Sequence, residues 1–236
     1  MNEKYHSLCP DEKKFSFLVS AASRNYHKEL IKLIQDIPFS QSELTKALDY
    51  SSSSCDVFTV KILLDAGAVF NEENISILIN AVEDENTEVA AFLIHELGNI
   101  NIVDGMGFSL LHHTSSVSRD QDFLTYLLYK GLDVNKQDNY GRTALMHTLL
   151  SIELDPENWF VEFGEKLLGA GADPNMHDNE GCTVLMMACK YEGYTLYGDE
   201  ALIEFMKMLI HNGADVSIQN NQGQTALDIV GEGTSV

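Results

Sequence analysis

The sequence predicts an all-α array of helix pairs that repeats along nearly all of its 236 residues. Two phrases carry this prediction, because each returns several times in the same order. The first is a leucine-rich stretch that ends at a glycine; these glycines are Gly67, Gly98, Gly131, Gly171 and Gly213. The second is a polar turn phrase between them, with Gly107, Gly141, Gly181 and Gly223. The spacing of both sets lengthens in step toward the C-terminus, which chance does not explain.

Each phrase has a physical function in the predicted unit. A leucine pair near the end of an amphipathic stretch, followed by glycine, is typical of a helix that ends at a residue of positive φ. The turn phrase joins short polar side chains to a glycine that adopts positive φ. A hydroxyl residue then stands where a helix N-cap is expected, at Ser109, Thr143, Thr183 and Thr225. One unit is therefore a turn, a short helix, a loop, a second helix and a glycine stop.

This unit resembles the ankyrin repeat, whose pattern is a Gly-x-Thr-Pro-Leu-His start and a Gly-Ala-Asp-x-Asn finish over about 33 residues. Residues 171–175 and 213–216 are close to the finish of the family pattern. The starts at Gly107, Gly141, Gly181 and Gly223 are more degenerate, because their proline is absent. The histidine of the pattern remains as His112, for which the resemblance implies a structural role.

Three earlier and weaker units begin near Phe17, Ser42 and Ile75. With them, the resemblance implies an ankyrin-repeat solenoid of about six helix pairs and a C-terminal half repeat, whose helix ends near Val230. The expected division of the chain is an N-terminal extension at 1–14, the repeat array at 15–230 and a C-terminal tail at 231–236.

Equivalent leucines of successive units are expected to stack into one core, because each unit of a solenoid contacts only its neighbours. The two expected rows are Leu145, Leu185 and Leu227 from first helices, and Leu127, Leu167 and Leu209 from second helices. The first unit is the most basic and lacks the glycine finish, which favours a capping role.

The last two units are longer than the others, and the extra residues must lie between their first and second helices because the flanking phrases are intact. They are SIELDPENWF from Ser151 and YEGYTLYGDE from Tyr191. Insertions in repeat proteins often lie on the binding face. The acids and aromatics expected to contact a partner there are Glu153, Asp155, Trp159, Tyr191, Tyr194, Tyr197 and Asp199.

The matching loop of the third unit adds Glu83, Asp84 and Glu85. If the repeats stack, these loops are expected to line up as an acidic edge. Tyr and Trp are enriched at binding hot spots, and acids select a basic partner. The alternative is that the aromatic rings, Trp159 above all, fold back onto the helices and that the acids are only solvated.

The turn tips offer a second candidate surface. Met106, Phe108, Tyr140 and Arg142 flank the turn glycines, where side chains are expected to project rather than pack. The resemblance implies this surface too, because ankyrin proteins commonly bind through their turns and first helices. Isolated exposed apolar residues are nevertheless common on protein surfaces.

The net charge of −21 is concentrated after residue 40, where nine Lys and Arg residues stand against thirty-one Asp and Glu residues. Such a charge disfavours nucleic acid and anionic membrane surfaces and favours a basic protein partner. The alternative interpretation is that the negative charge contributes only to solubility. No apolar run approaches the roughly 18 residues of a membrane span, and the four cysteines show no CxxC spacing. The first residues contain no apolar stretch of the kind found in signal peptides, so no secretory signal is expected. The expected state is a reduced, cytoplasmic protein that is monomeric when free.

The sequence shows no phosphate-binding loop, no HExxH motif and no GxSxG elbow. The adjacent His112 and His113 do not point to one metal, because neighbouring helical residues diverge by about 100°. Two stretches that start at Asp133 and Asp173 look like EF-hand loops, but both lack the required glycine and glutamate. We therefore expect no catalytic residues, no metal and no cofactor.

The sequence accordingly predicts a non-catalytic protein–protein interaction module that binds and masks a basic protein, as inhibitor or immunity proteins do. The alternative is a scaffold or adaptor, for example a secreted effector that engages host proteins through its ankyrin surface. An enzyme with scattered catalytic residues is disfavoured, because the repeats leave no unassigned domain for an active-site cleft.

Overall fold

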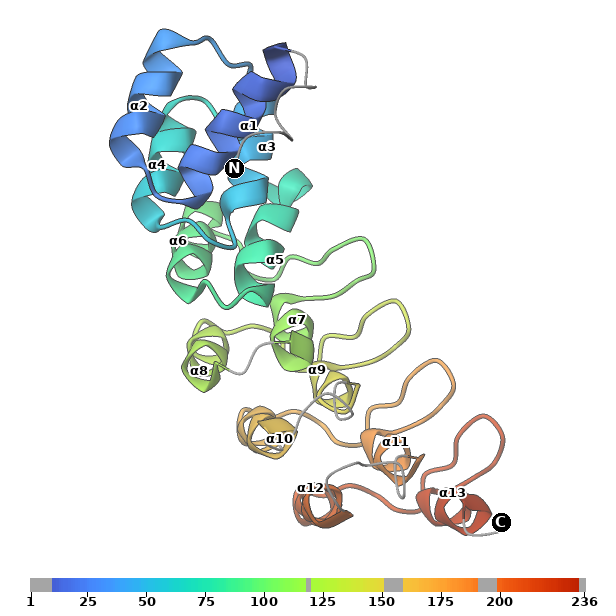
Figure 1. Ribbon diagram of the computed structural model, residues 1–236. Helices are drawn as coiled ribbons and strands as arrows, with labels where there is room; N and C mark the ends of the chain where they lie inside the picture. Colours follow the sequence, from blue (N-terminus) through green and yellow to red (C-terminus); the bar gives the residue numbers. More distant parts are fainter. Residues whose placement is uncertain (1–9, 118–119, 151–158, 191–198, 234–236) are drawn as a thin grey trace. The chain divides into compact units, whose positions relative to one another are not determined.

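A computed structural model of the chain describes residues 10–117, 120–150, 159–190 and 199–233. It divides the chain into two compact units, Met1–Ile100 and Asn101–Val236. Both units are built from pairs of antiparallel helices (Figure 1), and the described residues form no β-strand beyond two isolated bridges, Val103 with Ser109 and His177 with Thr183. The predicted all-α class is confirmed.

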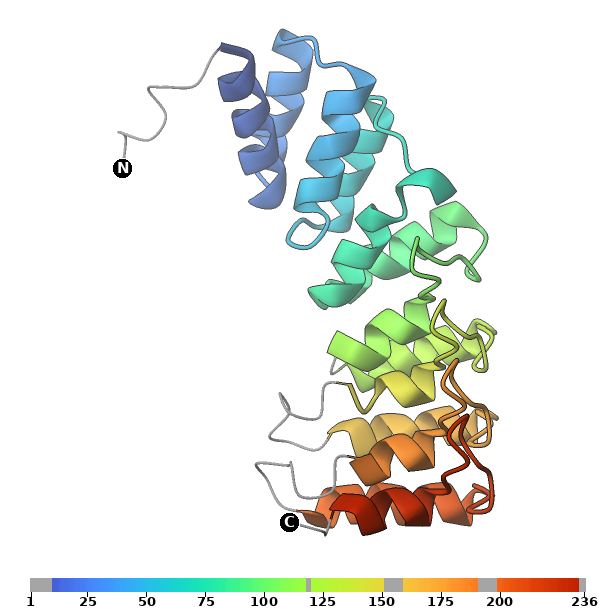
Figure 2. The ribbon, with the colours of Figure 1, turned by 90° about the vertical axis from the view of Figure 1, so that its right-hand side faces the viewer.

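The first unit contains three helix pairs. They are α1 (Pro10–Ser23) with α2 (His27–Asp36), α3 (Gln41–Ser51) with α4 (Val57–Asp65), and α5 (Ser76–Glu83) with α6 (Thr87–Leu97). A short 3-10 turn, η1 (Glu72–Asn74), precedes α5. The first helices α1 and α3 pack side by side, as do the second helices α2 and α4 (Figure 2). Since α1 begins at Pro10, helical structure starts before the array boundary predicted at residue 15.

The second unit contains three further pairs and a single last helix. They are α7 (Leu110–Val117) with α8 (Gln121–Tyr129), α9 (Ala144–His147) with α10 (Trp159–Gly169), α11 (Val184–Lys190) with α12 (Asp199–His211), and then α13 (Ala226–Gly233). The first helices form one layer and the second helices form another, with long turns that project side by side from the first layer (Figure 1). Six pairs and a half repeat were predicted, and this architecture is confirmed.

The helices end and begin where the two phrases predict. All nine glycines of the phrases have positive φ, between 69° and 109°. Thr225 caps α13, because its hydroxyl accepts from the Asp228 amide at 3.3 Å while the Asp228 carboxylate accepts from the Thr225 amide at 2.8 Å. Thr143 occupies the N-cap position of α9, but its hydroxyl makes no capping hydrogen bond. The position of the hydroxyl residue was therefore predictable, but its bonding was not.

The core follows one predicted leucine row completely and the other only in part. Leu127, Leu167 and Leu209 on the second helices are fully buried, and so are Leu145 and Leu185 on first helices. Leu227 was expected to continue the row of the first helices but is 78% exposed. The reason is positional: Leu185 is covered by α13, with which α11 packs, whereas no described helix follows α13 to cover Leu227.

Candidate functional site

The turns of the second unit are rigid because an aspartate or asparagine side chain closes each of them. Asp138 shows the pattern: its Oδ1 accepts from the backbone amides of Tyr140 and Arg142, both at 2.8 Å. Its own backbone amide donates to the Arg142 carbonyl at 2.9 Å. Asp104, Asp178 and Asn220 make the equivalent side-chain bonds in their turns. The buried acids of the turn phrase are therefore structural, and the residues at the tips are left to face solvent.

Neighbouring turns are joined to one another through a ladder of asparagines. The backbone amide of Asn139 donates to the Met106 carbonyl at 3.0 Å, that of Asn179 to Tyr140 at 2.9 Å, and that of Asn221 to Glu180 at 3.0 Å. The three Asn side chains also donate to the preceding turn, at 3.0–3.1 Å. The tips are thereby held at a fixed spacing. We define the turn row as Met106, Tyr140, Glu180 and Gln222.

Two of the four predicted turn residues project as expected. Met106 and Tyr140 are 44% and 47% exposed, and the Arg142 guanidinium lies 5.5 Å from the centre of the Tyr140 ring. Glu180 and Gln222 occupy the same position in the next two turns and are exposed as well. Sequence reasoning missed these two, although their place before Gly181 and Gly223 repeats the place of Tyr140 before Gly141.

Phe108 does not project from its turn, contrary to expectation. Its ring is half-buried and packs edge-on against His147 with centroids 4.8 Å apart, and it is stacked on His112 at 5.9 Å. Stacked and edge-on rings are favourable arrangements for aromatic pairs. Phe108 is therefore part of a small aromatic cluster under the turns. Its ring stabilises the fold and does not project as a contact residue.

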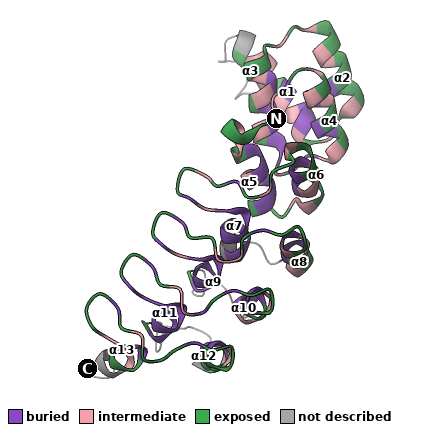
Figure 3. Cartoon of the chain, turned by 180° about the vertical axis from the view of Figure 1, so that it is seen from behind, coloured by how far each residue is buried: buried purple, intermediate pink, exposed green. Residues whose placement is uncertain are grey.

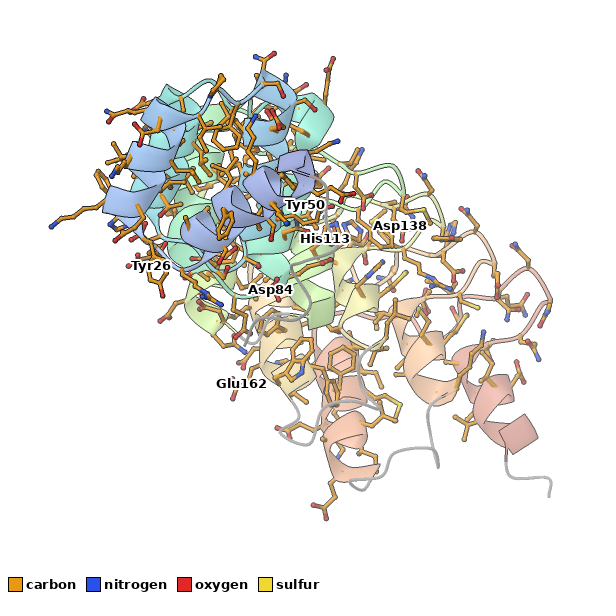
Figure 4. All side chains as sticks on the ribbon, turned by 45° about the horizontal axis from the view of Figure 1, so that its top comes forward. Tyr26, Tyr50, Asp84, His113, Asp138 and Glu162 are labelled. Atoms are coloured by element: carbon orange, nitrogen blue, oxygen red, sulfur yellow. The ribbon has the colours of Figure 1, made fainter. Side chains whose placement is uncertain are left out.

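The histidines of this cluster hold the turns rather than carry chemistry. Nδ1 of His112 accepts from the Ser109 amide at 3.0 Å, and its Nε2 lies 3.0 Å from the Arg142 carbonyl in the next turn, to which it donates. Burial lowers the pKa of His112 to about 4. Burial also lowers the pKa of His147, although its Nε2 lies 2.9 Å from an Asp138 oxygen (labelled in Figure 4). Both rings are neutral at pH 7, and the structural role implied for His112 is the one observed.

The helix-to-helix loops of the first unit lie next to one another, as predicted for stacked repeats. The Asp56 amide donates to Oδ1 of Asn25 at 2.8 Å. The Asn86 side chain donates to the carbonyls of Ser52 at 2.9 Å and Cys55 at 2.7 Å. Each loop is thus bonded to the next one, and the three form a continuous edge within this unit.

The acidic residues predicted for this edge are all at the surface. Glu83 ends α5, and Asp84 and Glu85 begin the loop that follows it; all three are exposed (Asp84 is labelled in Figure 4). Glu85 has φ 57°, in the left-handed region that non-glycine residues rarely adopt. Asn25 has φ 56° at the equivalent place, and its side chain bonds the next loop. The exposed triad is hereafter the acidic edge.

Trp159 is not a surface anchor. It is 8% exposed, and its ring packs edge-on against Phe163 of the same helix with centroids 4.8 Å apart. The alternative stated for this residue, that the ring folds back onto the helices, is the arrangement observed. Burying this large aromatic side chain removes much apolar surface from water, which favours the inward position.

The other predicted loop residues lie outside the part of the chain that the structure describes. They are Glu153, Asp155, Tyr191, Tyr194 and Tyr197, together with the side chain of Asp199, although Asp199 itself begins α12. Both predicted loops follow a first helix, but each was predicted two residues too long, because α10 already begins at Trp159 and α12 at Asp199.

Two exposed aromatics on first helices of the first unit were not predicted from the sequence. Phe17 on α1 and Tyr50 on α3 are both well exposed, and the ring of Phe15 lies edge-on to Tyr50 with centroids 6.2 Å apart (Tyr50 is labelled in Figure 4). The available signal was that α1 carries apolar residues at the three consecutive positions 17–19, which cannot all face one core. An exposed Phe and Tyr on adjacent first helices are candidates for partner contact.

The described residues contain no group of three or more His, Cys, Asp or Glu side chains arranged to hold a metal ion. No described helix combines the length and apolarity needed to cross a membrane. Among the described cysteines, Cys55, Cys182 and Cys189 are buried and not disulfide-bonded, and burial raises the pKa of the Cys55 thiol to about 11.

Comparison with known proteins agrees with this geometry. The family model for ankyrin repeats in three copies matches residues 59–138, and the single ankyrin-repeat model matches residues 180–221. Two ankyrin repeat proteins of fowlpox virus are 31% identical over 43% of this chain and 30% identical over 66% of it. The mouse ankyrin repeat and SOCS box protein 6 is 29% identical over 66% of this chain. The matches cover 24%, 48% and 36% of these relatives, so the chain spans less than half of their length.

Proposed function

Because the chain belongs to the ankyrin-repeat family and is thus a protein–protein interaction module, we propose that it binds and masks a protein partner with a basic surface. It acts without catalysis, in the manner of an inhibitor or an immunity protein. The observation that carries the proposal is the acidic edge: Glu83, Asp84 and Glu85 are adjacent, exposed and held on a loop bonded to its neighbour.

The rigidity of that loop favours binding over mere solvation. A carboxylate on a fixed loop loses little conformational freedom when a partner arrives, so more of its electrostatic attraction remains as affinity. Glu85 is held at φ 57°, which costs stability where a glycine would cost none. An acid retained at this exposed position supports a partner contact that uses its charge.

The turn row, which lies in the second unit, supplies a second proposed contact surface. Tyr140 and Met106 are exposed apolar side chains on turns that the asparagine ladder holds at fixed spacing, and Glu180 adds a negative charge in the same row. Aromatic anchors beside acids are the composition that binds a basic protein with both affinity and selectivity. The net charge of −21 would speed the approach of such a partner.

We further propose that the free protein is a monomer in a reducing compartment such as the cytoplasm. Its described cysteines support this proposal, since three buried cysteines without a disulfide are usual for reduced proteins.

The test begins with capture of partners from the cell of origin, followed by kinetics with the purified partner. In the edge variant, Glu83, Asp84 and Glu85 are changed to Lys. In the matched control, Glu165, Glu200 and Glu204, which are exposed on the second helices α10 and α12, are changed to Lys. Both variants change the net charge equally, so general electrostatics affects them alike.

We expect one basic partner whose association rate falls at least about tenfold in the edge variant and much less in the control. The rate should also decrease with added salt, and this dependence should flatten in the edge variant. An equal loss of rate in both variants, or a partner with an acidic surface, would contradict the proposal. A Tyr140→Ala variant then tests the turn row through the dissociation rate.

A scaffold or adaptor, such as an effector that engages host proteins, remains the second candidate. The observation that favours it is that the turn row and the acidic edge belong to different units of the chain. In that case two partners are captured, and the edge variant loses one while the Tyr140→Ala variant loses the other.

A further inference from the structure

The three helix-to-helix loops of the first unit change in charge in one direction along their shared edge. Their residues are Arg-Asn-Tyr-His-Lys at 24–28, Ser-Cys-Asp-Val-Phe at 54–58 and Asp-Glu-Asn-Thr-Glu at 84–88. Each stretch has its third residue at the N-cap of a second helix, so the three stretches are structurally equivalent. The first carries an Arg and a Lys and no acid, the second carries one Asp, and the third carries three acids and no basic residue.

The first and the last residue of each stretch are exposed. They form two rows that cross the three repeats, with Arg24, Ser54 and Asp84 in one row and Lys28, Phe58 and Glu88 in the other. Figure 3 shows exposed and intermediate residues on all three second helices, α2, α4 and α6, in agreement with these exposures. The six residues are hereafter the bipolar edge. Its ends are of opposite charge, and its middle carries an aromatic ring.

The two charged ends are held apart by the middle repeat, because α2 packs on α4 and α4 packs on α6 (Figure 1). The axes of packed helices lie about 8–10 Å apart, so about 16–20 Å separate the basic end from the acidic end. This distance is about two Debye lengths at physiological salt, so the two ends hardly act on each other. Both ends are therefore available to charges of a partner.

The middle of the bipolar edge presents a ring rather than a charge. Phe58 is 54% exposed, and the His27 ring from the preceding loop lies edge-on to it with centroids 4.9 Å apart. The one acid of the middle loop, Asp56, is already bonded: its carboxylate accepts from the Thr59 amide at 2.8 Å and lies 2.9 Å from Nε2 of His27. The Asp56 amide is fixed in turn by the Asn25 side chain at 2.8 Å. A partner therefore meets an apolar contact at this point, on loops that are already ordered.

The end charges are not compensated within the part of the chain that the structure describes. No ion pair or side-chain hydrogen bond between described residues involves Arg24, Lys28, Asp84 or Glu88. Glu29 follows Lys28 in the sequence, but it stands at the position of Thr59 and Val89, which are buried. Since consecutive helical residues diverge by about 100°, Glu29 faces a different side of α2 from Lys28. The basic end is therefore not cancelled by its neighbour.

A second copy of the chain is a poorer occupant of this edge than another protein. The order of charges is self-complementary, because a two-fold rotation near Phe58 would bring the basic end of one copy to the acidic end of the other. Two copies that each carry a net charge of −21 repel one another, however, whereas a protein with a basic surface is attracted. The charge of the edge and the charge of the whole chain therefore agree only for a partner protein.

From these observations we propose that the bipolar edge binds one segment of a partner protein that is bipolar in the opposite sense. Basic residues at one end of the segment face Asp84 and Glu88, aliphatic side chains in its middle cover Phe58, and an acidic residue at its other end faces Arg24 and Lys28. The Arg24 guanidinium suits such a carboxylate, because it pairs with both oxygens at once. This inference rests on the proposed function, since Asp84 belongs to the acidic edge as well, and it adds the direction in which the partner lies.

The test uses two stapled helices as probes. The bipolar probe has about 14 residues, which span about 20 Å as a helix, with a pair of glutamates in the first turn, leucine and alanine in the middle and a pair of arginines in the last turn. The basic probe is identical except that arginines replace the glutamates. A hydrocarbon staple keeps both probes helical, so that folding does not consume their affinity. The net charge of −21 favours the basic probe, so a preference for the bipolar probe can arise only from the local arrangement of charges.

Binding to the full chain is measured by NMR chemical-shift mapping and by titration calorimetry. The parent chain should bind the bipolar probe several-fold tighter than the basic probe, with shifts of the amides in residues 24–28, 54–58 and 84–88. In the uniform variant, Arg24→Glu and Lys28→Glu make both ends acidic, so the order of the two probes should reverse. In the matched control, the exposed Lys136 and Lys207 of the second unit are changed to Glu. This control alters the net charge equally and should leave the order of the probes unchanged.

The variant Phe58→Ser tests the middle of the bipolar edge. It should weaken binding of the bipolar probe about tenfold, since it removes one large apolar contact. Ile203→Ser, which changes an exposed apolar residue of the second unit, should leave the affinity within about twofold. All the substituted side chains are exposed, so circular dichroism should show the variants folded like the parent chain.

Three results would overturn the proposal. The first is a basic probe that binds the parent chain tighter than the bipolar probe, because the edge would then be an acidic site only, and the proposed function would stand. The second is the absence of shifts in the three loops with either probe. The third is a dimer of the free chain in sedimentation equilibrium that Phe58→Ser abolishes, which would make the occupant a second copy. The proposed function is tested separately, by the association rate of the captured partner with the edge variant, so its failure is distinguished from each of these results.

Discussion

The asparagine ladder makes a quantitative prediction about two glycines that look identical in the sequence. Gly181 and Gly223 both follow a polar turn, and their φ angles are 79° and 78°. A Cβ at Gly223 would meet nothing within 4 Å. A Cβ at Gly181 would lie 2.8 Å from both the backbone nitrogen and Oδ1 of Asn221, because the last turn stacks on it. Alanine should therefore be tolerated very differently at the two positions.

The expected costs follow from these contacts. Positive φ costs alanine about 1–2 kcal/mol relative to glycine at either position. At Gly181 the Asn221 turn must also move, which strains two hydrogen bonds to the preceding turns worth about 1 kcal/mol each. We expect Gly223→Ala to lower the free energy of unfolding by about 1–2 kcal/mol and Gly181→Ala by about 3–4 kcal/mol.

Urea denaturation followed by far-ultraviolet circular dichroism measures both variants against the parent chain. Repeat arrays can unfold without full cooperativity, so hydrogen exchange at the Asn221 backbone amide is used to measure the local stability of the asparagine ladder. The Asn221 amide should exchange faster in Gly181→Ala and remain protected in Gly223→Ala. Equal losses of stability in the two variants would refute the claim that stacked turns, rather than φ alone, determine the need for glycine.

Three further predictions concern the loops, the histidines and the tryptophan. Asn25→Gly should lower the free energy of unfolding by about 1–2 kcal/mol even though Asn25 has φ 56°, because the Asn25 side chain bonds the next loop; thermal melts against the parent chain measure the loss, and an unchanged melt would contradict it. The pKa of His112 lies at about 4 in the folded chain, below its ordinary value of 6.5, so the unfolded chain takes up the proton first. Stability should therefore be present above pH 6.5 and fall by up to about 3 kcal/mol as the pH decreases toward 4; urea midpoints from pH 7 to 4 should change less steeply in His112→Gln, and parallel slopes would contradict this cause. Trp159→Ala should lower the free energy of unfolding by about 3–5 kcal/mol, because it leaves a cavity. A variant that kept its stability but no longer bound the partner protein would instead show that Trp159 acts as a contact residue.

The sequence by itself determined the repeat and almost everything that follows from local spacing. The two glycine sets require positive φ wherever they occur, so they mark helix ends and turns without knowledge of the fold. Leucines at helical spacing identify the buried side of each helix, which is why Leu127, Leu167 and Leu209 were predicted correctly. The exposed positions of Met106 and Tyr140 follow from the turn phrase in the same way.

Only the tertiary structure decided which of these residues are covered by a neighbour. Leu227 has the same local sequence context as Leu185, but its burial depends on a helix that would have to pack on α13. Phe108 and Trp159 were expected at the surface. The Phe108 ring instead packs against His147 of the following repeat, and Trp159 is only 8% exposed in the folded chain. Spacing defines the face on which a side chain stands, whereas burial is a property of the two surfaces that meet there.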